Sequence, residues 1–155
     1  MPFINSKITK KITREEEVVV KEKLGRAIEL IPGKSEAWLM VNFEPESHLY
    51  FKGSNEKDIA YVEVSVFGSE NKEAFNNLTA EITKIFNEVL GIEPERIYVK
   101  YMTTTNWGWN GRGLTAPNGS AYFSLNHLIP WVKSPQEKWY IPAYFDSILL
   151  GCTNI

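Results

Sequence analysis

The sequence predicts a mixed α/β fold in which two helices cover one face of a four-stranded sheet. Alternating, strand-like segments and segments with helical spacing follow one another in the order β-α-β and then repeat that order. A chain of 155 residues has the length of one domain, or of one domain with an appendage. Helical connections favour parallel pairing within each half. A ferredoxin-like fold has the same order of elements, and periodicity does not separate the two topologies.

The first half begins with a strand from Pro2 to Thr9. Thr13 can cap a helix, and Glu16 lies at the reciprocal position of a capping box. A Pro-Gly pair ends this helix. A second strand is predicted from Ala37 to Phe43. The apolar stripe of the helix consists of Val20, Leu24, Ala27, Ile28 and Ile31.

The second half follows a polar loop from Glu44 to Lys57. Ile59 to Phe67 alternates as a strand, and Ile97 to Tyr101 alternates as the last strand. The helix between them ends at Gly91. Its apolar stripe consists of Phe75, Leu78, Ile82, Ile85, Phe86 and Val89.

Composition excludes several classes of protein. With 43% hydrophobic residues and a net charge of -2, the chain resembles neither a disordered protein nor a basic nucleic-acid binder. No segment has the length of a membrane span. The single cysteine, Cys152, and two distant histidines predict no internal disulfide, no metal site and no cofactor. No signal peptide is visible, so the expected location is the cytoplasm, with leaderless secretion left open.

The composition changes near Arg112. From Gly113 onward only four residues are charged, no period is visible, and prolines interrupt the segment. We therefore expect one domain over residues 1–112 and a C-terminal extension over 113–155 without a fold of its own. This extension is rich in aromatic residues, namely Tyr122, Phe123, Trp131, Trp139, Tyr140, Tyr144 and Phe145.

A few residues could carry chemistry, and each also has an ordinary structural interpretation. Removal of the initiator Met would leave Pro2 with a free secondary amine, which titrates near ~8 in water and lower when buried. Such an amine can act as a general base. Lys34 is either a cation facing an acidic substrate or a solvated turn lysine. Tyr98 either donates a hydrogen bond in a pocket or is a half-buried strand residue.

Several motifs together resemble the macrophage migration inhibitory factor family of the tautomerase superfamily. The similarity covers about residues 1–112, with one apparent insertion before Ala60. The motifs are Met1-Pro2-Phe3-Ile4, Gly33-Lys34, Phe51-Lys52-Gly53-Ser54, Val66-Phe67-Gly68, Pro94-Glu95-Arg96-Ile97-Tyr98 and Asn106-Trp107-Gly108-Trp109-Asn110.

The resemblance implies a keto-enol tautomerase that acts on phenylpyruvate-type or dopachrome-type compounds. Pro2 matches the catalytic base, and Lys34 matches the lysine that holds the substrate carboxylate. Phe67 falls where the family uses a backbone amide, and Trp107 falls on the pocket wall. Tyr98 matches a tyrosine from the neighbouring subunit, because the resemblance also implies a homotrimer with each site between two subunits.

Departures from the family pattern leave alternatives open. Lys100 stands where the vertebrate cytokine has a substrate-contacting asparagine, and the vertebrate CxxC motif is absent. The chain could instead be a cytokine-like, host-directed binding protein that recognises a receptor, with a vestigial site. Hydration or dehalogenation of an unsaturated acid ranks lower, because such enzymes add pocket arginines. The four arginines of the first 112 residues are at no obvious pocket position.

Overall fold

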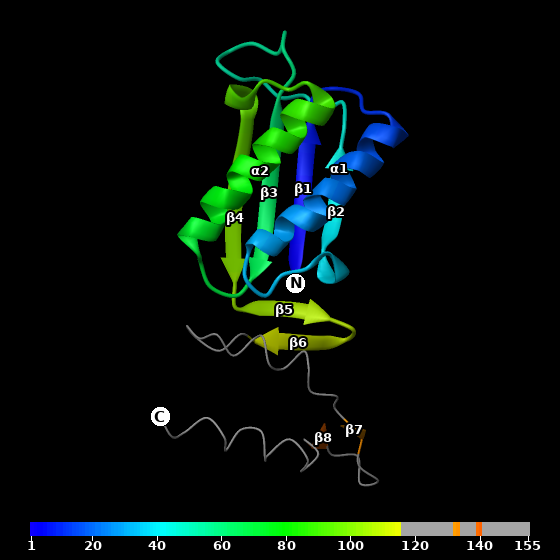
Figure 1. The fold of residues 1–155 in the computed structure, drawn as a ribbon, viewed down its shortest axis with the longest axis vertical. Helices are drawn as coiled ribbons and strands as arrows, with labels where there is room; N and C mark the ends of the chain where they lie inside the picture. Colours follow the sequence, from blue (N-terminus) through cyan, green and yellow to red (C-terminus); the bar gives the residue numbers. More distant parts are fainter. Residues whose placement is uncertain (116–131, 134–138, 141–155) are drawn as a thin grey trace. The chain divides into compact units, whose positions relative to one another are not determined.

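The computed structural model describes residues 1–115, 132–133 and 139–140, and the chain divides into two compact units, Met1–Gly119 and Ser120–Ile155. The first unit contains the predicted sheet and its two helices (Figure 1). Its main elements are β1 (Pro2–Ile8), α1 (Arg14–Ala27), β2 (Met40–Glu44), β3 (Ala60–Phe67), α2 (Lys72–Leu90) and β4 (Ile97–Thr104). In the second unit, β7 (Val132–Lys133) pairs antiparallel with β8 (Trp139–Tyr140).

The sheet has the strand order β2-β1-β3-β4. β1 pairs parallel with β2, and β3 pairs parallel with β4, which confirms the pairing predicted for each half. The two halves join through antiparallel pairing of β1 with β3, in which Pro2 faces Val66. In a split β-α-β arrangement another strand separates the two parallel strands. The observed order is therefore not ferredoxin-like.

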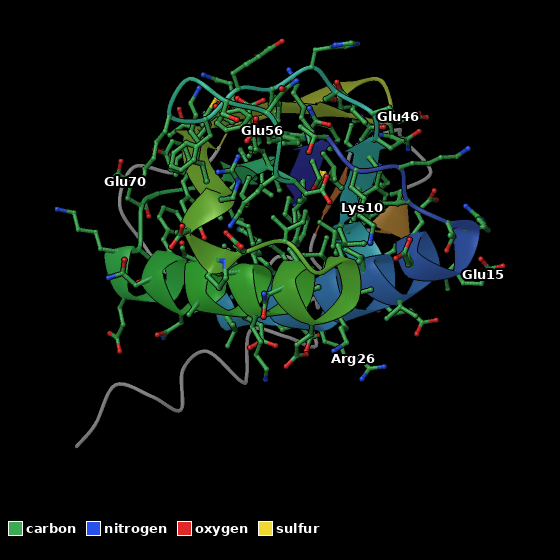
Figure 2. All side chains as sticks on the ribbon, turned by 90° about the horizontal axis from the view of Figure 1, so that it is seen from above. Lys10, Glu15, Arg26, Glu46, Glu56 and Glu70 are labelled. Atoms are coloured by element: carbon green, nitrogen blue, oxygen red, sulfur yellow. The ribbon has the colours of Figure 1, made fainter. Side chains whose placement is uncertain are left out.

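Both helices cover the same face of the sheet (Figure 1). In the view along the strands the labelled Glu15 and Arg26 point away from the sheet (Figure 2). The core lies between the layers, where the predicted apolar stripes are buried or packed against the core. Its largest fully buried side chains include Ile4, Ile8, Leu24, Ile28, Leu78, Ile82, Ile85, Phe86, Leu90 and Ile92. Within the described residues, no helix is long and apolar enough to cross a membrane.

The capping box predicted at the start of α1 is present. The Glu16 amide donates to the Thr13 hydroxyl at 3.2 Å, and the Thr13 amide donates to the Glu16 carboxylate at 2.8 Å. These contacts satisfy two amides that the first helical turn leaves without helical partners. The same backbone hydrogen bond lowers the pKa of Glu16.

Replacing Thr13 with Ala should lower the free energy of unfolding by ~1 kcal/mol, because the cap hydroxyl is lost. Chemical denaturation measures the difference. Thr13→Ser keeps the hydroxyl and serves as the matched control, so it should retain most of the stability. Equal losses in both variants would show that the hydroxyl does not stabilise the helix.

The strand predicted from Ala37 to Phe43 was wrong at its start. Glu36–Trp38 forms a 3₁₀ turn, η2, closed by a hydrogen bond from the Leu39 amide to the Glu36 carbonyl at 3.0 Å. Ala37 is therefore exposed rather than on the core face. The predicted alternation holds from Leu39 onward, since Leu39, Val41 and Phe43 pack against the core.

The aromatic motif Asn106-Trp107-Gly108-Trp109-Asn110 after β4 is part of a hairpin. β5 (Asn106–Trp109) pairs antiparallel with β6 (Arg112–Thr115). Asn110 and Gly111 connect them with φ values of 50° and 71°, which is typical of a two-residue hairpin. β6 begins at the residue where the predicted domain ends. That boundary remains a prediction, and most of the proposed extension lies outside the described residues.

Candidate active site

One edge of the sheet gathers most of the predicted site residues. Because β1 is antiparallel to β3 and β4 is parallel to β3, Pro2 lies at the same end of the sheet as the last residues of β3 and β4. Figure 1 shows the N-terminus at this edge, next to β5. A cavity of about 940 Å³ opens here. Its walls include Met1, Pro2, Trp38, Met40, Ser65, Met102, Thr104, Trp107 and Trp109.

The N-terminal amine lies in this cavity. Pro2 is buried at the start of β1, and Met1, which the chain described here retains, is half-buried. Burial and, second, the positive charge of Lys34 lower the pKa of the Met1 amine to about 6. An amine with this pKa is mostly neutral at pH 7, so the environment favours the basic form.

The Met1 carbonyl accepts a hydrogen bond from the backbone at the end of β3. The Phe67 amide donates to the Met1 carbonyl at 3.1 Å. Removal of Met1 would remove that carbonyl acceptor. The resemblance assigns this same backbone amide to substrate binding, although the Phe67 side chain itself is buried.

Lys34 lies in the turn after α1, at the edge that carries the amine. Gly33 precedes it with a φ of 74°, a left-handed conformation that glycine adopts without strain. The side chain is half-buried, and this burial lowers the pKa of the ammonium group. A Cβ placed on Gly68 would lie 3.9 Å from the Lys34 Nζ, so the charge is close to the residue that follows Phe67.

Aromatic rings form much of the cavity wall. Trp107 lies on β5 with its ring centre 6.4 Å from that of Phe67. Trp38 and Trp109 meet edge to face at 5.1 Å. The structure therefore brings Pro2, Lys34, Phe67 and Trp107 to one edge of the sheet.

Tyr98 does not join this group within one chain. It lies near the start of β4, five residues before Thr103, whose β3 partner Val66 faces Pro2. At ~3.3 Å per strand residue, Tyr98 is about 16 Å along the strand from this edge. Tyr98 is 57% exposed, on the face of the sheet that the helices leave uncovered.

Lys100 lies on the same face as Tyr98 and forms an ion pair. Its Nζ is 3.5 Å from the Glu63 carboxylate, which also accepts a hydrogen bond from the Tyr61 hydroxyl at 3.1 Å. Glu63 therefore offsets part of the positive charge that Lys100 adds to this face.

Sequence reasoning missed part of the cavity wall. Trp38, Met40 and Met102 line the cavity, and Trp109 was noted in its motif but not assigned to a site. Met40, Met102 and Trp109 are large apolar side chains with exposures of 69%, 42% and 50%. Trp38 follows Lys34 by only four residues and ends the 3₁₀ turn. Had this turn been predicted, the short separation from Lys34 would have indicated that Trp38 lies near the cavity.

These observations define a class: an α/β protein of two β-α-β halves with its N-terminal amine in an aromatic-walled cavity. The family model described as Macrophage migration inhibitory factor (MIF) matches residues 1–115. The chain belongs to the macrophage migration inhibitory factor family. Comparison with curated protein sequences finds no match.

Solved structures support the same fold. MIF2 from Leishmania major is 28% identical with a TM-score of 0.69, over 74% of this chain and 97% of that protein. The homologue from Prochlorococcus marinus is 24% identical with a TM-score of 0.64, over 72% of this chain and 98% of that one. The Toxoplasma gondii protein is 17% identical with a TM-score of 0.67, over 72% and 99%.

Proposed function

We propose that the protein is a keto-enol tautomerase whose general base is the amine of Pro2, exposed when Met1 is removed. The observation that carries this proposal is the environment of the N-terminal amine. In the chain that retains Met1, burial and the nearby Lys34 charge lower the pKa of the Met1 amine to about 6, and removal of Met1 would place the Pro2 amine at this end of the sheet. A base with a pKa near the working pH is the most effective in proton transfer.

The reaction moves one proton next to a carbonyl. In the keto-to-enol direction, the Pro2 nitrogen takes a proton from the carbon beside the carbonyl, and the electron pair of that C–H bond forms an enolate. The protonated Pro2 amine then gives this proton to the enolate oxygen, which yields the enol and restores the neutral amine, and the reverse sequence gives the ketone. A positioned base contributes a typical ~10²–10⁴-fold to the rate.

Two other groups support this step. Lys34 would bind the substrate carboxylate, and its charge also favours the neutral amine. The Phe67 amide donates to the Met1 carbonyl at 3.1 Å in the unprocessed chain. After removal of Met1 it would donate to a substrate oxygen. A preorganised donor at a developing oxyanion contributes a few kcal/mol in enzymes, on the order of 3.

We also propose that the site is shared between copies of the chain in a homotrimer. Tyr98 and Pro2 lie at different ends of one sheet, so Tyr98 can reach an amine only in a second copy. The exposed Tyr98 ring on the uncovered sheet face is consistent with such a role. Lys100 follows on the same face and would bring further positive charge toward an anionic substrate.

The aromatic wall supports a substrate with a flat ring. Trp107, Trp38 and Trp109 can pack against an aryl group while Lys34 binds a carboxylate at the same edge. Phenylpyruvate-type compounds combine these features, and dopachrome-type compounds are the second candidates.

The first test is a spectrophotometric assay of phenylpyruvate ketonisation on protein whose Met1 removal has been verified by mass spectrometry. We expect turnover above the uncatalysed rate that titrates with protein concentration. Absence of turnover for both phenylpyruvate and dopachrome substrates would contradict the proposal and favour a binding function.

A further inference from the structure

Arg96 is a buried cation held by a loop and by an aromatic ring. It ends the 3₁₀ turn η3 (Pro94–Arg96) and is only 9% exposed. Its Nε donates to the Asp58 carbonyl and its Nη2 to the Lys57 carbonyl, both at 3.1 Å. Its guanidinium carbon lies 5.4 Å from the centre of the Phe51 ring, within range of a cation-π contact.

Phe51 is itself held in place by its backbone. Phe51 and Ser54 exchange two backbone hydrogen bonds, of 2.9 and 3.1 Å, around a two-residue turn. Lys52 and Gly53 form that turn with φ values of 52° and 78°. The Lys52 Nζ lies 5.2 Å from the Phe51 ring centre, so a second cation contacts the same ring.

The Phe51 ring in turn contacts Tyr98. The two ring centres are 5.4 Å apart with an interplanar angle of 83°, an edge-to-face arrangement. Tyr98 follows Arg96 by two residues, so the strand that carries Tyr98 starts directly from the anchored arginine. An exposed tyrosine ring would otherwise sample several orientations.

We propose that Phe51, held by Arg96, is a positioning residue that orients the Tyr98 hydroxyl for the site of a neighbouring copy. This inference rests on the proposed function, because it takes Tyr98 as a group that reaches substrate. Phe51 acts only through Tyr98, so its effect on catalysis depends on the presence of the Tyr98 hydroxyl.

A double-mutant cycle measured by phenylpyruvate turnover tests this dependence. Tyr98→Phe should lower kcat/KM about 10-fold, the equivalent of one lost hydrogen bond. Phe51→Leu should lower kcat/KM about 5-fold when Tyr98 is present. The loss is smaller than in Tyr98→Phe because a misoriented Tyr98 hydroxyl still makes part of its hydrogen bond to substrate. In the Tyr98→Phe background, Phe51→Leu should cause no further loss.

Two further variants separate positioning from general damage. Phe51→Tyr keeps an aromatic ring and should restore wild-type kcat/KM. Phe75→Leu is the matched control, because Phe75 stacks on another tyrosine, Tyr101, at 4.3 Å. Phe75→Leu should lower the midpoint of thermal unfolding and leave kcat/KM of the folded protein unchanged.

Tyrosine-selective ¹³C NMR on the same variants gives a readout that does not need turnover. The Tyr98 ring signals, assigned by their loss in Tyr98→Phe, should shift in Phe51→Leu and remain near wild type in Phe51→Tyr. Two results with active wild-type protein would overturn the positioning role alone. One is that Phe51→Leu lowers kcat/KM equally in the wild-type and Tyr98→Phe backgrounds, and the other is that Phe51→Leu leaves the Tyr98 signals unshifted. Wild-type protein without turnover would overturn the proposed function and the site role of Tyr98 together.

Discussion

Inserting one alanine between Met1 and Pro2 should lower kcat/KM of the tautomerase reaction by ~10²-fold or more. The insertion places Pro2 nitrogen in a peptide bond, so it is no longer basic. The structure shows a second effect of a preceding residue, because the Met1 carbonyl already occupies the Phe67 amide at 3.1 Å. The added residue would therefore make the Pro2 nitrogen non-basic and would also keep the Phe67 amide bonded to a carbonyl of the chain.

The fold of the inserted variant should remain intact, because the cavity already accommodates a residue before Pro2. Circular dichroism and analytical ultracentrifugation would establish this. Pro2→Gly, which leaves a primary amine at the same position after processing, is the matched control and should retain weak activity. If the inserted variant and the processed wild type have the same kcat/KM, Pro2 is not the base.

Lys34→Ala should raise KM for phenylpyruvate by ~10-fold or more, because a charge-assisted contact with the carboxylate is lost. Lys34 is also the second cause of the lowered pKa of the N-terminal amine. Its removal should therefore raise that pKa and move the pH dependence of kcat/KM to higher pH.

Lys11→Ala is a suitable control for Lys34→Ala. Lys11 is an exposed lysine beyond the other end of β1, so its removal changes the net charge equally without altering the cavity. Steady-state kinetics at pH 7 would compare the two variants. Equal KM values for wild type and Lys34→Ala would remove Lys34 from the site.

Sequence patterns predicted the main elements because each buries one regular face. The helix stripes and the alternating strand residues lie in one core, as their spacing requires. Strand order depends on pairing between distant segments, so periodicity left two topologies open until β1 was seen between β2 and β3. The turn at Glu36–Trp38 was missed because Ala37 continues, in sequence, the alternation of Leu39, Val41 and Phe43.

The site was less accessible to sequence reasoning than the fold. Pro2 and Lys34 were identified through motifs. The structure adds that both lie at one end of the sheet, where burial lowers the pKa of the Met1 amine and of the Lys34 ammonium group. The environment of Tyr98 was not predictable, because the Phe51 ring reaches it only through the path of the loop after β2.

The pH dependence of kcat/KM for phenylpyruvate ketonisation by the Met1-processed protein tests the central claim most directly. A neutral amine is the active form, so kcat/KM should be low in acid and rise with pH through one pKa. That pKa should lie well below ~8, the ordinary value of an α-amino group, as the pKa of about 6 for the Met1 amine in the same cavity indicates. A profile that rises only near pH 10, or that does not change between pH 5 and 8, would contradict a Pro2 base.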